Sequence, residues 1–260
     1  MKVSEKIQFI SNWIKNYVES MPSKAESLVI GVSGGIDSSV SSTLSAMTGL
    51  KTIVLSMPIK QKSTQHDLSL KHQEWLIKKF KNVEAHTLSL DKLFESFENS
   101  LKKFENDHGM ANSRARLRMT TLYQVAAANK GIVVGTGNKV EDFGVGFYTK
   151  YGDGGVDLSP IADLMKSEIY QIAAFLKVPE SIQKAAPTDG LFGDSRTDED
   201  QIGASYDELE WAMKTKKSGK KATDFVDREK EVFEIYTKLN TSNQHKMVPI
   251  PVCEIPKELK

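Results

Sequence analysis

A short apolar segment that runs straight into a glycine turn constrains the fold of this chain more than any other feature. Residues 28–32, LVIGV, are typical of a buried β-strand, and the next residues, SGGIDSS, predict a tight turn that opens into a helix. Such a turn directs unpaired backbone N–H groups and the positive helix end at one point, where an anion can bind. Gly34 and Gly35 let the backbone approach a phosphate closely, and the neighbouring serine hydroxyls add donors. The segment therefore predicts a phosphate site at the end of a strand.

The turn differs from the phosphate-binding loop of kinases and GTPases, because it lacks the Gly-Lys-Ser/Thr sequence of that loop. Asp37 stands where that loop carries its lysine. A carboxylate beside a polyphosphate is explained if it binds Mg²⁺. The pattern resembles the pyrophosphate loop of the ATP pyrophosphatase superfamily, whose members cleave ATP between its α and β phosphates. The alternative is a serine-rich helix cap behind a core strand.

Apolar segments and helical patterns alternate through the first half of the chain. They predict strands at residues 28–32, 52–57, 83–88 and 132–135, and helices at about 3–21, 37–48, 64–80, 90–106 and 114–130. Strands joined by helical crossovers form a parallel sheet that is covered on both faces. We therefore expect an α/β fold, a doubly wound parallel sheet flanked by helices and similar to the Rossmann fold. Ligands bind such sheets at the carboxyl ends of the strands, where residues 33–39, 56–58 and 135–138 lie.

The second half of the chain is less regular. Residues 138–157 predict a glycine-rich loop, residues 187–196 a mobile surface loop, and residues 214–221 a basic, flexible link. Helices are expected at about 166–176, from the Thr197 capping box onward, and at about 223–239. We expect a single domain over residues 1–260, with the core sheet at about 25–137 and the substrate-binding loops, lid and C-terminal helices at about 138–260.

Composition and charge exclude several classes of protein. The 260 residues include 35 Lys and Arg against 34 Asp and Glu, so no overall field attracts the chain to nucleic acid or to a membrane. A single cysteine, Cys253, rules out a disulfide framework and a cysteine zinc cluster. The first residues lack the apolar core of a signal peptide, and no segment reaches membrane-spanning length. A cytoplasmic protein is expected.

A second acidic residue is predicted at the edge of the sheet that holds Asp37. Glu141 ends the segment GTGNKVE, directly after the fourth predicted strand. One or two carboxylates, together with phosphate oxygens and water, are the ligands that Mg²⁺ prefers. Taken alone, Glu141 is better explained as a solvated loop residue, but combined with the glycine turn it predicts a metal site.

The segment YGDGGVDLSP at 151–160 concentrates glycines and acids. It is not a calcium loop, because the required spacing and the terminal glutamate are missing, and a plain turn is the alternative. The aromatic residues around Lys150 suit a ligand that has an aromatic ring and a phosphate or carboxylate. His245 and Lys246 join this site only if the C-terminal tail folds back onto it.

The chain resembles the family of ammonia-dependent NAD synthetases. Four segments carry the resemblance, SGGIDSS at 33–39, GTGNKVE at 135–141, GFYTKYGDGGVDLSP at 146–160 and KAAPTDGL at 184–191. The tail NQHKMVPIP at 243–251 is similar to the family's His-Lys ending, so the resemblance spans nearly the whole chain. One departure is the stretch between Glu141 and Phe147, which is a residue longer than in bacterial members of the family.

The resemblance implies a role for each matching residue. ATP would be bound by Gly31, Val32, Ser33, Gly34, Gly35, Ile36, Asp37, Ser38, Met57, Thr136, Lys166 and Thr188. Deamido-NAD would be bound by Arg116, Lys150, Asp157, His245 and Lys246. Asp37 and Glu141 would hold Mg²⁺ and act in catalysis with Lys166, while Asp153 or Asp194 would help to deprotonate ammonium. Family members are homodimers with deamido-NAD at the subunit interface, which implies the same assembly here.

The implied reaction is the last step of NAD biosynthesis. The nicotinate carboxylate of deamido-NAD attacks the α-phosphorus of ATP, which gives an acyl-adenylate and pyrophosphate, and ammonia then displaces AMP. Positioning and charge neutralisation are sufficient for the first step, so no side-chain nucleophile is needed. Water must be kept from the adenylate, and residues 187–196 are the candidate lid.

Other functions are weaker alternatives. A GMP synthetase-type enzyme would share the loop, whereas a tRNA thiolation enzyme usually needs catalytic cysteines or a basic surface, which this sequence lacks. A non-catalytic nucleotide-binding protein does not require two metal carboxylates. Glutamine is not expected to be the nitrogen source, because Cys253 lies in a proline-bounded tail with nothing to activate a thiolate.

Overall fold

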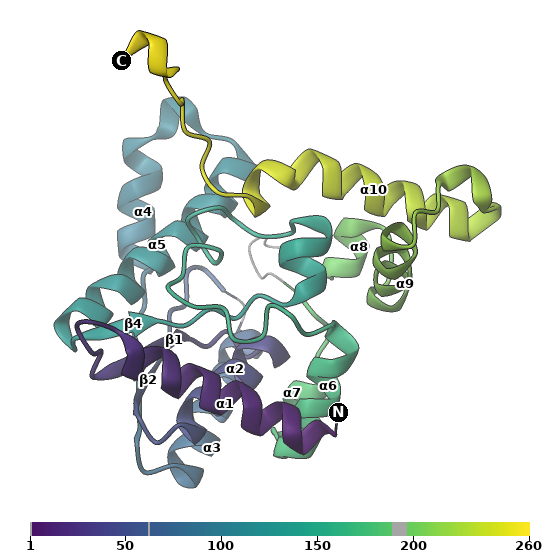
Figure 1. Ribbon diagram of the computed structural model, residues 1–260. Helices are drawn as coiled ribbons and strands as arrows, with labels where there is room; N and C mark the ends of the chain where they lie inside the picture. Colours follow the sequence, from purple (N-terminus) through teal and green to yellow (C-terminus); the bar gives the residue numbers. More distant parts are fainter. Residues whose placement is uncertain (1, 62, 189–196) are drawn as a thin grey trace.

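A parallel sheet forms the centre of the molecule (Figure 1). The computed structural model describes residues 2–61, 63–188 and 197–260, and within them the sheet has four strands in the order β3-β2-β1-β4. The strands are β1 (Ser27–Gly31), β2 (Lys51–Ser56), β3 (Val83–Thr87) and β4 (Gly131–Val133). β1 is central, because Leu28 lies opposite both Thr52 of β2 and Ile132 of β4. The carboxyl ends of β1 and β4 therefore lie side by side.

Helices cover both faces of the sheet. They are α1 (Val3–Ser20), α2 (Ile36–Met47), α3 (Ser63–Lys79), α4 (Asp91–Ser100), α5 (Asp107–Ala128), α6 (Lys166–Leu176), α7 (Glu180–Gln183), α8 (Asp198–Ile202), α9 (Tyr206–Lys217) and α10 (Asp227–Met247). Leu28 and Ile30 pack with α1, α2 and α6, whereas Val29 and Leu55 pack with α4 and α5. Figure 1 shows α1 and α2 across the strands from α4 and α5, which confirms the predicted doubly wound α/β fold. Among the described residues, no helix combines the length and apolarity needed to span a membrane.

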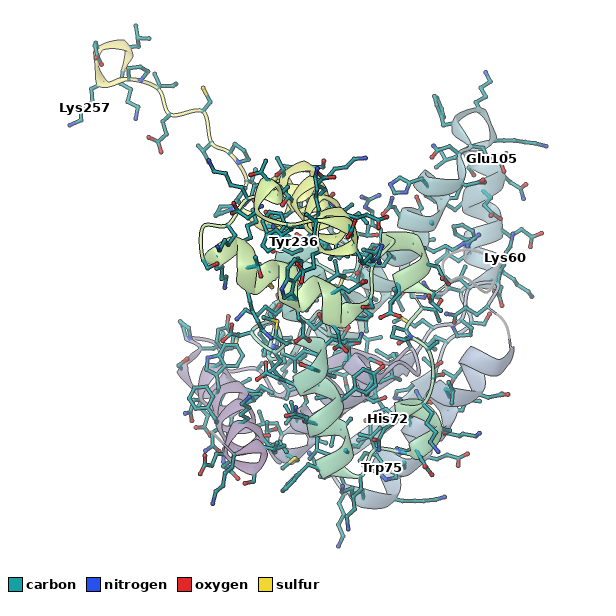
Figure 2. All side chains as sticks on the ribbon, turned by 90° about the vertical axis from the view of Figure 1, so that its right-hand side faces the viewer. Lys60, His72, Trp75, Glu105, Tyr236 and Lys257 are labelled. Atoms are coloured by element: carbon teal, nitrogen blue, oxygen red, sulfur yellow. The ribbon has the colours of Figure 1, made fainter. Side chains whose placement is uncertain are left out.

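A third core lies beyond the sheet, among the C-terminal helices. Val140 and Val145 belong to a π-helix, η2 (Lys139–Val145), and pack with α8, α9 and α10. Figure 2 shows Tyr236 of α10 among these helices, at the other end of the molecule from Trp75 of α3. Because η2 follows β4 closely in the chain, it connects the edge of the sheet to the C-terminal helices.

Most of the predicted elements are confirmed to within a residue or two. α6 has the predicted bounds, and each predicted strand matches an observed one. The capping box at the start of α8 is also confirmed. Thr197 Oγ1 accepts a hydrogen bond from Asp200 N at 3.1 Å, and the Asp200 carboxylate accepts one from Thr197 N at 2.9 Å.

Three predictions in the central part of the chain are wrong. Residues 90–106 form α4 followed by a 3₁₀ turn, Lys102–Phe104, rather than one helix. α5 begins earlier than predicted because the Asn106 side chain caps it, accepting a hydrogen bond from Gly109 N at 2.6 Å. Residues 139–145 form η2 rather than a loop, because Asn138 caps the start and Gly146 ends the helix in a left-handed conformation.

Two predictions near the C-terminus are also wrong. Residues 214–217 belong to α9, so the link to α10 covers residues 218–226 instead of the predicted 214–221, and it contains a 3₁₀ turn, Ala222–Asp224. α10 continues to Met247, well beyond the predicted end at residue 239. The last two turns of α10 lack an apolar pattern, and they are held by tertiary contacts described below.

Candidate active site

The predicted phosphate loop lies at the carboxyl end of the central strand β1. Gly34 adopts a left-handed conformation with φ of 88°, and Gly35 is the N-cap of α2. Two serines close the turn, since Ser38 Oγ donates to Gly35 O at 3.0 Å and Gly35 N donates to Ser33 Oγ at 3.1 Å. The start of α2 thus directs its backbone N–H groups and its positive end to the edge of the sheet, as an anion site requires.

Buried polar side chains fix α2 behind the loop. Ser41 Oγ donates to the carbonyl of Gly135, which follows β4, at 2.7 Å. Ser42 Oγ lies 2.8 Å from Nε2 of His72, and burial lowers the pKa of His72 to about 3, so the ring stays neutral. The Ser41 contact joins α2 to the segment that carries Glu141, and the Ser42 contact joins α2 to α3.

A largely buried cluster of one lysine and two carboxylates lies next to the loop. Lys166 Nζ is 2.6 Å from Asp37 Oδ2 and 2.9 Å from Glu141 Oε1, and only 2% of the lysine side chain is exposed. Asn138 Nδ2 donates to Asp37 Oδ1 at 3.1 Å, and Asn138 Oδ1 accepts from Glu141 N at 3.1 Å. The fold therefore brings together residues from the start of α2, the segment after β4 and the start of α6.

Electrostatic interactions couple the three charged groups. Burial would lower the pKa of Lys166, but Asp37 and Glu141 together raise it, so the ammonium stays charged at neutral pH. Burial and the charge of Glu141 raise the pKa of Asp37 above its usual value, although Lys166 lowers it. Burial also disfavours the charge on Glu141, but Lys166 and a hydrogen bond from Tyr206 lower its pKa below the usual value. With both carboxylates ionised, the cluster has one more negative charge than positive.

The donor set fits a Mg²⁺ ion that takes its other ligands from a nucleotide. One or two carboxylates beside phosphate oxygens form the usual Mg²⁺ site in such proteins. A polyphosphate would add negative charge to a cluster with more carboxylates than lysines, and a divalent cation offsets that charge. Within the described ranges, no three acidic, histidine or cysteine side chains converge as a metal site, so phosphate oxygens or water would complete the coordination.

Tyr206 is a site residue that was not predicted. Its hydroxyl donates to Glu141 Oε1 at 2.6 Å and lies 3.3 Å from Asp198 Oδ2, and its ring lies 4.6 Å from Lys166 Nζ. Burial and Glu141 raise the pKa of Tyr206, so the hydroxyl stays a neutral donor. The local sequence signal is the capping box that begins at Ser205, which predicts a helix start but no contact with Glu141.

Replacing Tyr206 with phenylalanine is expected to weaken the cluster. A hydrogen bond to a charged group contributes about 1.5–3 kcal/mol. We expect the free energy of unfolding, measured with urea, to fall by about this amount, because Glu141 loses a donor. Tyr17→Phe is the control, since Tyr17 lies on the outer side of α1 and is 40% exposed. Equal effects of the two substitutions would show that the Tyr206 hydroxyl does not hold Glu141.

Four of the residues assigned to deamido-NAD converge on the loop after η2. Arg116 Nε donates to Lys150 O at 3.2 Å, and Lys150 Nζ donates to His245 O at 3.1 Å. Lys246 Nζ donates to Tyr148 O at 2.8 Å. The end of α10 thus folds back onto this loop, which is the condition set above for His245 and Lys246 to join the site.

Asp157, the fifth of these residues, is held next to β4 and α5. Its carboxylate accepts hydrogen bonds from Tyr123 Oη at 3.0 Å and from Val133 N at 2.7 Å. Tyr123 also lines a cavity of about 660 Å³ between α5 and the loop after η2, together with Met119, Thr120, Gln124, Tyr151 and Gly155. This volume is within the range of small-molecule binding pockets.

Two aspartates with raised pKa values lie near Glu141. Asp153 Oδ1 accepts from Thr149 N at 2.9 Å, and desolvation, with a smaller contribution from Glu141, raises the pKa of Asp153 to about 6. Asp142 was not predicted, and its carboxyl packs against Gly137, where an added Cβ would lie 2.0 Å from Asp142 Oδ2. Burial and the charge of Glu141 raise the pKa of Asp142 well above its usual value. Both aspartates therefore take up a proton more readily than an aspartate in water.

The other predicted site residues lie at the edges of this region. Met57 follows β2, and its carbonyl accepts a hydrogen bond from Arg118 Nε at 2.9 Å. Thr136 lies between Gly135 and the Asn138 cap, and Thr188 is the last residue of the second described range. Residues 189–196 lie outside the described residues, and they include Asp194 and most of the predicted lid.

The chain has a parallel sheet with a glycine loop after its central strand, and two carboxylates lie at the same edge of the sheet. These features define an α/β nucleotide-binding protein. The family model described as NAD synthase matches residues 6–249 of this chain. The chain belongs to the NAD synthase family.

Relatives and solved structures match over most of the chain. The NH(3)-dependent NAD(+) synthetase of Mesoplasma florum is 39% identical over 215 residues, covering 81% of this chain and 84% of that protein. The NH(3)-dependent NAD(+) synthetase of Alkaliphilus metalliredigens is 34% identical over 267 residues, covering 98% and 100%. The structure of NMN synthetase from Francisella tularensis aligns with a TM-score of 0.84 at 32% identity and covers 99% of both chains. The NH3-dependent NAD synthetase from Campylobacter jejuni aligns with a TM-score of 0.77 at 25% identity, covering 98% and 100%.

Proposed function

We propose that this chain amidates deamido-NAD with ammonia and splits ATP into AMP and pyrophosphate at the edge of the sheet around Asp37. As a member of the NAD synthase family, it is a ligase of the final step of NAD biosynthesis. The main support for this location of the reaction is that Lys166 contacts both Asp37 and Glu141 directly beside the phosphate loop. We also propose that residues 1–260 act as one domain, because η2 shares a core with the C-terminal helices.

In this proposal, the loop after β1 binds the phosphates of ATP with its backbone N–H groups, and Met57, Thr136 and Thr188 contact the rest of the nucleotide. Asp37 and Glu141 hold Mg²⁺, which when bound neutralises charge on the phosphates. Lys166 orients both carboxylates and adds positive charge where negative charge accumulates in the reaction. The supporting observations are the loop geometry and the short contacts of the Lys166 ammonium.

We also propose that deamido-NAD is bound by Arg116, Lys150, His245 and Lys246. Asp157 would bind it too, next to the cavity between α5 and the loop after η2. The nicotinate carboxylate attacks the α-phosphorus, pyrophosphate leaves, and an acyl-adenylate forms. Ammonium gives a proton to Asp153, ammonia attacks the acyl carbon, the bond to AMP breaks, and the added nitrogen releases one further proton to solvent. A pKa of about 6 suits Asp153 for this transfer, because the group is ionised at pH 7 and still accepts a proton.

Replacing Asp153 with asparagine is expected to change two pH profiles. The pKa of Asp153 is raised from 3.8 to about 6 in the folded protein, so its contribution to stability is present below pH 4 and is lost as the pH rises through 6. The wild type should therefore lose stability relative to Asp153→Asn between about pH 4 and 6, as measured with urea. Turnover at low ammonium should rise through about pH 6 in the wild type only. Identical pH profiles for the two proteins would remove Asp153 from the ammonia step.

The proposal includes a homodimer. α4 and α5 expose large apolar side chains, among them Leu93 and Tyr123, and Tyr123 also lines the α5 cavity. A second copy packed on this surface would complete a pocket for deamido-NAD. Sedimentation at micromolar protein should give the mass of two chains, and a fully active monomer would contradict this part of the proposal.

A mononucleotide substrate is the second candidate. It is favoured by the structure named NMN synthetase, which covers 99% of this chain with a TM-score of 0.84. The acid amidated would then be nicotinate mononucleotide, which lacks the adenylyl half of deamido-NAD. Both substrates present the same nicotinate carboxylate to ATP, so the cluster around Lys166 suits either of them.

Product analysis tests the reaction and separates the two substrates. The purified chain is given ATP, MgCl₂, ammonium and either deamido-NAD or nicotinate mononucleotide. We expect NAD, AMP and pyrophosphate in equal amounts, and a higher kcat/KM for deamido-NAD. A preference for the mononucleotide would contradict the proposed substrate, and formation of ADP in place of AMP would contradict the proposed reaction.

Glutamine is not expected to replace ammonium as the nitrogen source, because the single cysteine, Cys253, lies exposed in the C-terminal tail.

A further inference from the structure

The C-terminal helix α10 binds the π-helix η2 through two asparagine side chains. Asn240 Nδ2 donates to Gly144 O at 2.7 Å, and Asn243 Nδ2 donates to Val145 O at 2.8 Å. We propose that Asn240 and Asn243 are positioning residues that set the geometry of Glu141 for binding Mg²⁺ with ATP. The inference rests on the proposed role of Glu141 as a metal ligand.

η2 needs partners outside itself. π-helices are rare, short and frequent at functional sites, and the last carbonyls of any helix lack partners within that helix. In η2, Asn138 caps the start, whereas the carbonyls of Gly144 and Val145 at the end accept hydrogen bonds from α10. The C-terminal helix therefore supplies bonds that η2 cannot make with its own backbone.

The end of η2 also binds the backbone of Glu141. The Glu141 carbonyl accepts hydrogen bonds from the N–H groups of Gly146 and Phe147, the second at 2.9 Å. α10 approaches this turn so closely that a Cβ added to Gly146 would lie 2.4 Å from Asn243 Cβ. A shift of α10 would thus move Gly146, and with it the backbone that directs the Glu141 carboxylate at Lys166.

Lys216 of α9 determines how the Asn240 amide is oriented. Lys216 Nζ donates to Asn240 Oδ1 at 2.7 Å. An ammonium can only donate, so the amide oxygen faces Lys216 and the amino group faces Gly144. The contact between α9 and α10 therefore selects the orientation in which Asn240 binds η2.

A purely structural role for the asparagines predicts a different outcome. Val232, Phe233 and Tyr236 already bury the apolar face of α10 in the third core, so α10 is expected to stay docked when one amide is changed. In a purely structural role, the loss of an amide would lower thermal stability and leave Mg²⁺-dependent nucleotide binding unchanged.

Asn240→Asp and Asn243→Asp replace an amide donor with a carboxylate of the same size. Gln244→Glu is the matched control, because it makes the same chemical change at an exposed position of α10. ATP binding to the full chain is measured by titration calorimetry in MgCl₂ and in EDTA, without deamido-NAD. We expect each asparagine variant to weaken ATP binding about tenfold in MgCl₂ and not in EDTA, and Gln244→Glu to have no effect.

Glu141→Gln in the same titrations separates the two proposals. MgCl₂ is expected to increase the affinity for ATP. If Glu141→Gln abolishes this increase and the asparagine variants keep it, only the positioning proposal is overturned. If Glu141→Gln has no effect, the metal assignment fails and the positioning proposal fails with it. Asn240→Ala removes the donor without adding charge, and circular dichroism checks its fold. A folded Asn240→Ala protein with the wild-type response to MgCl₂ would also overturn the proposal.

Discussion

Replacing Lys166 with methionine is expected to abolish AMP formation and to destabilise the protein at neutral pH. Lys166 is 2% exposed and contacts both Asp37 and Glu141, so the variant leaves two carboxylates facing each other without a cation. Removing one partner of a buried ion pair costs about 3–5 kcal/mol. We expect the free energy of unfolding, measured with urea at pH 7, to fall by about this amount.

The destabilisation should become smaller in acid. The pKa of Glu141 is lowered in the folded protein, because Lys166 and Tyr206 outweigh burial. Its ion pair therefore contributes stability above the unfolded pKa, near 4.5, and loses it as the pH falls. Lys184→Met, which removes an exposed ion pair with Glu180, is the control and should change stability by less than about 1 kcal/mol. A Lys166→Met protein as stable as the wild type at pH 7 would contradict the coupling of the cluster.

Replacing Asp37 with asparagine is expected to lower turnover by about 10²–10³-fold, the usual effect of losing one preorganised electrostatic group. The amide has the size of the carboxylate but does not carry the charge that pairs with Lys166 and would hold Mg²⁺. Because burial already raises the pKa of Asp37, the fold should tolerate a neutral side chain at this position. AMP formation at saturating ATP and MgCl₂ measures the loss, and circular dichroism checks the fold.

The matched control for this substitution is Asp163→Asn. Asp163 forms an ion pair with Lys139, but its side chain is 96% exposed, so its neutralisation should leave turnover unchanged. Glu141→Gln should lower turnover as Asp37→Asn does, since both carboxylates contact Lys166. Wild-type turnover in a folded Asp37→Asn protein would remove Asp37 from the site.

The sheet and the phosphate loop could be predicted from the sequence because their signals are local. Apolar β-branched segments mark the strands, and the turn at Gly34 and Gly35 follows one of them directly. The contact between the ends of β1 and β4 then follows from the rules for parallel sheets, and the hydrogen bond from Asn138 to Asp37 shows this contact in the structure.

The surroundings of Glu141 could not be predicted, because they depend on distant parts of the chain. Glycines within residues 138–157 argue against a helix, yet these residues include η2, whose last carbonyls accept hydrogen bonds from Asn240 and Asn243 of α10. The contact of Tyr206 with Glu141 likewise joins α9 to η2. Lys166 was assigned to ATP by resemblance, but nothing near it in the sequence indicates its pairing with two carboxylates.

The reaction proposed for this site begins with attack of the nicotinate carboxylate on the α-phosphorus of ATP. The most direct test uses deamido-NAD labelled with ¹⁸O in both oxygens of that carboxylate, with ATP, MgCl₂ and ammonium. Mass spectrometry of the products is expected to show one labelled oxygen in each AMP and one in the amide of each NAD. The AMP acquires its label because ammonia attacks the acyl carbon and the former carboxylate oxygen leaves on phosphorus. Unlabelled AMP, or label in inorganic phosphate together with ADP, would contradict the acyl-adenylate.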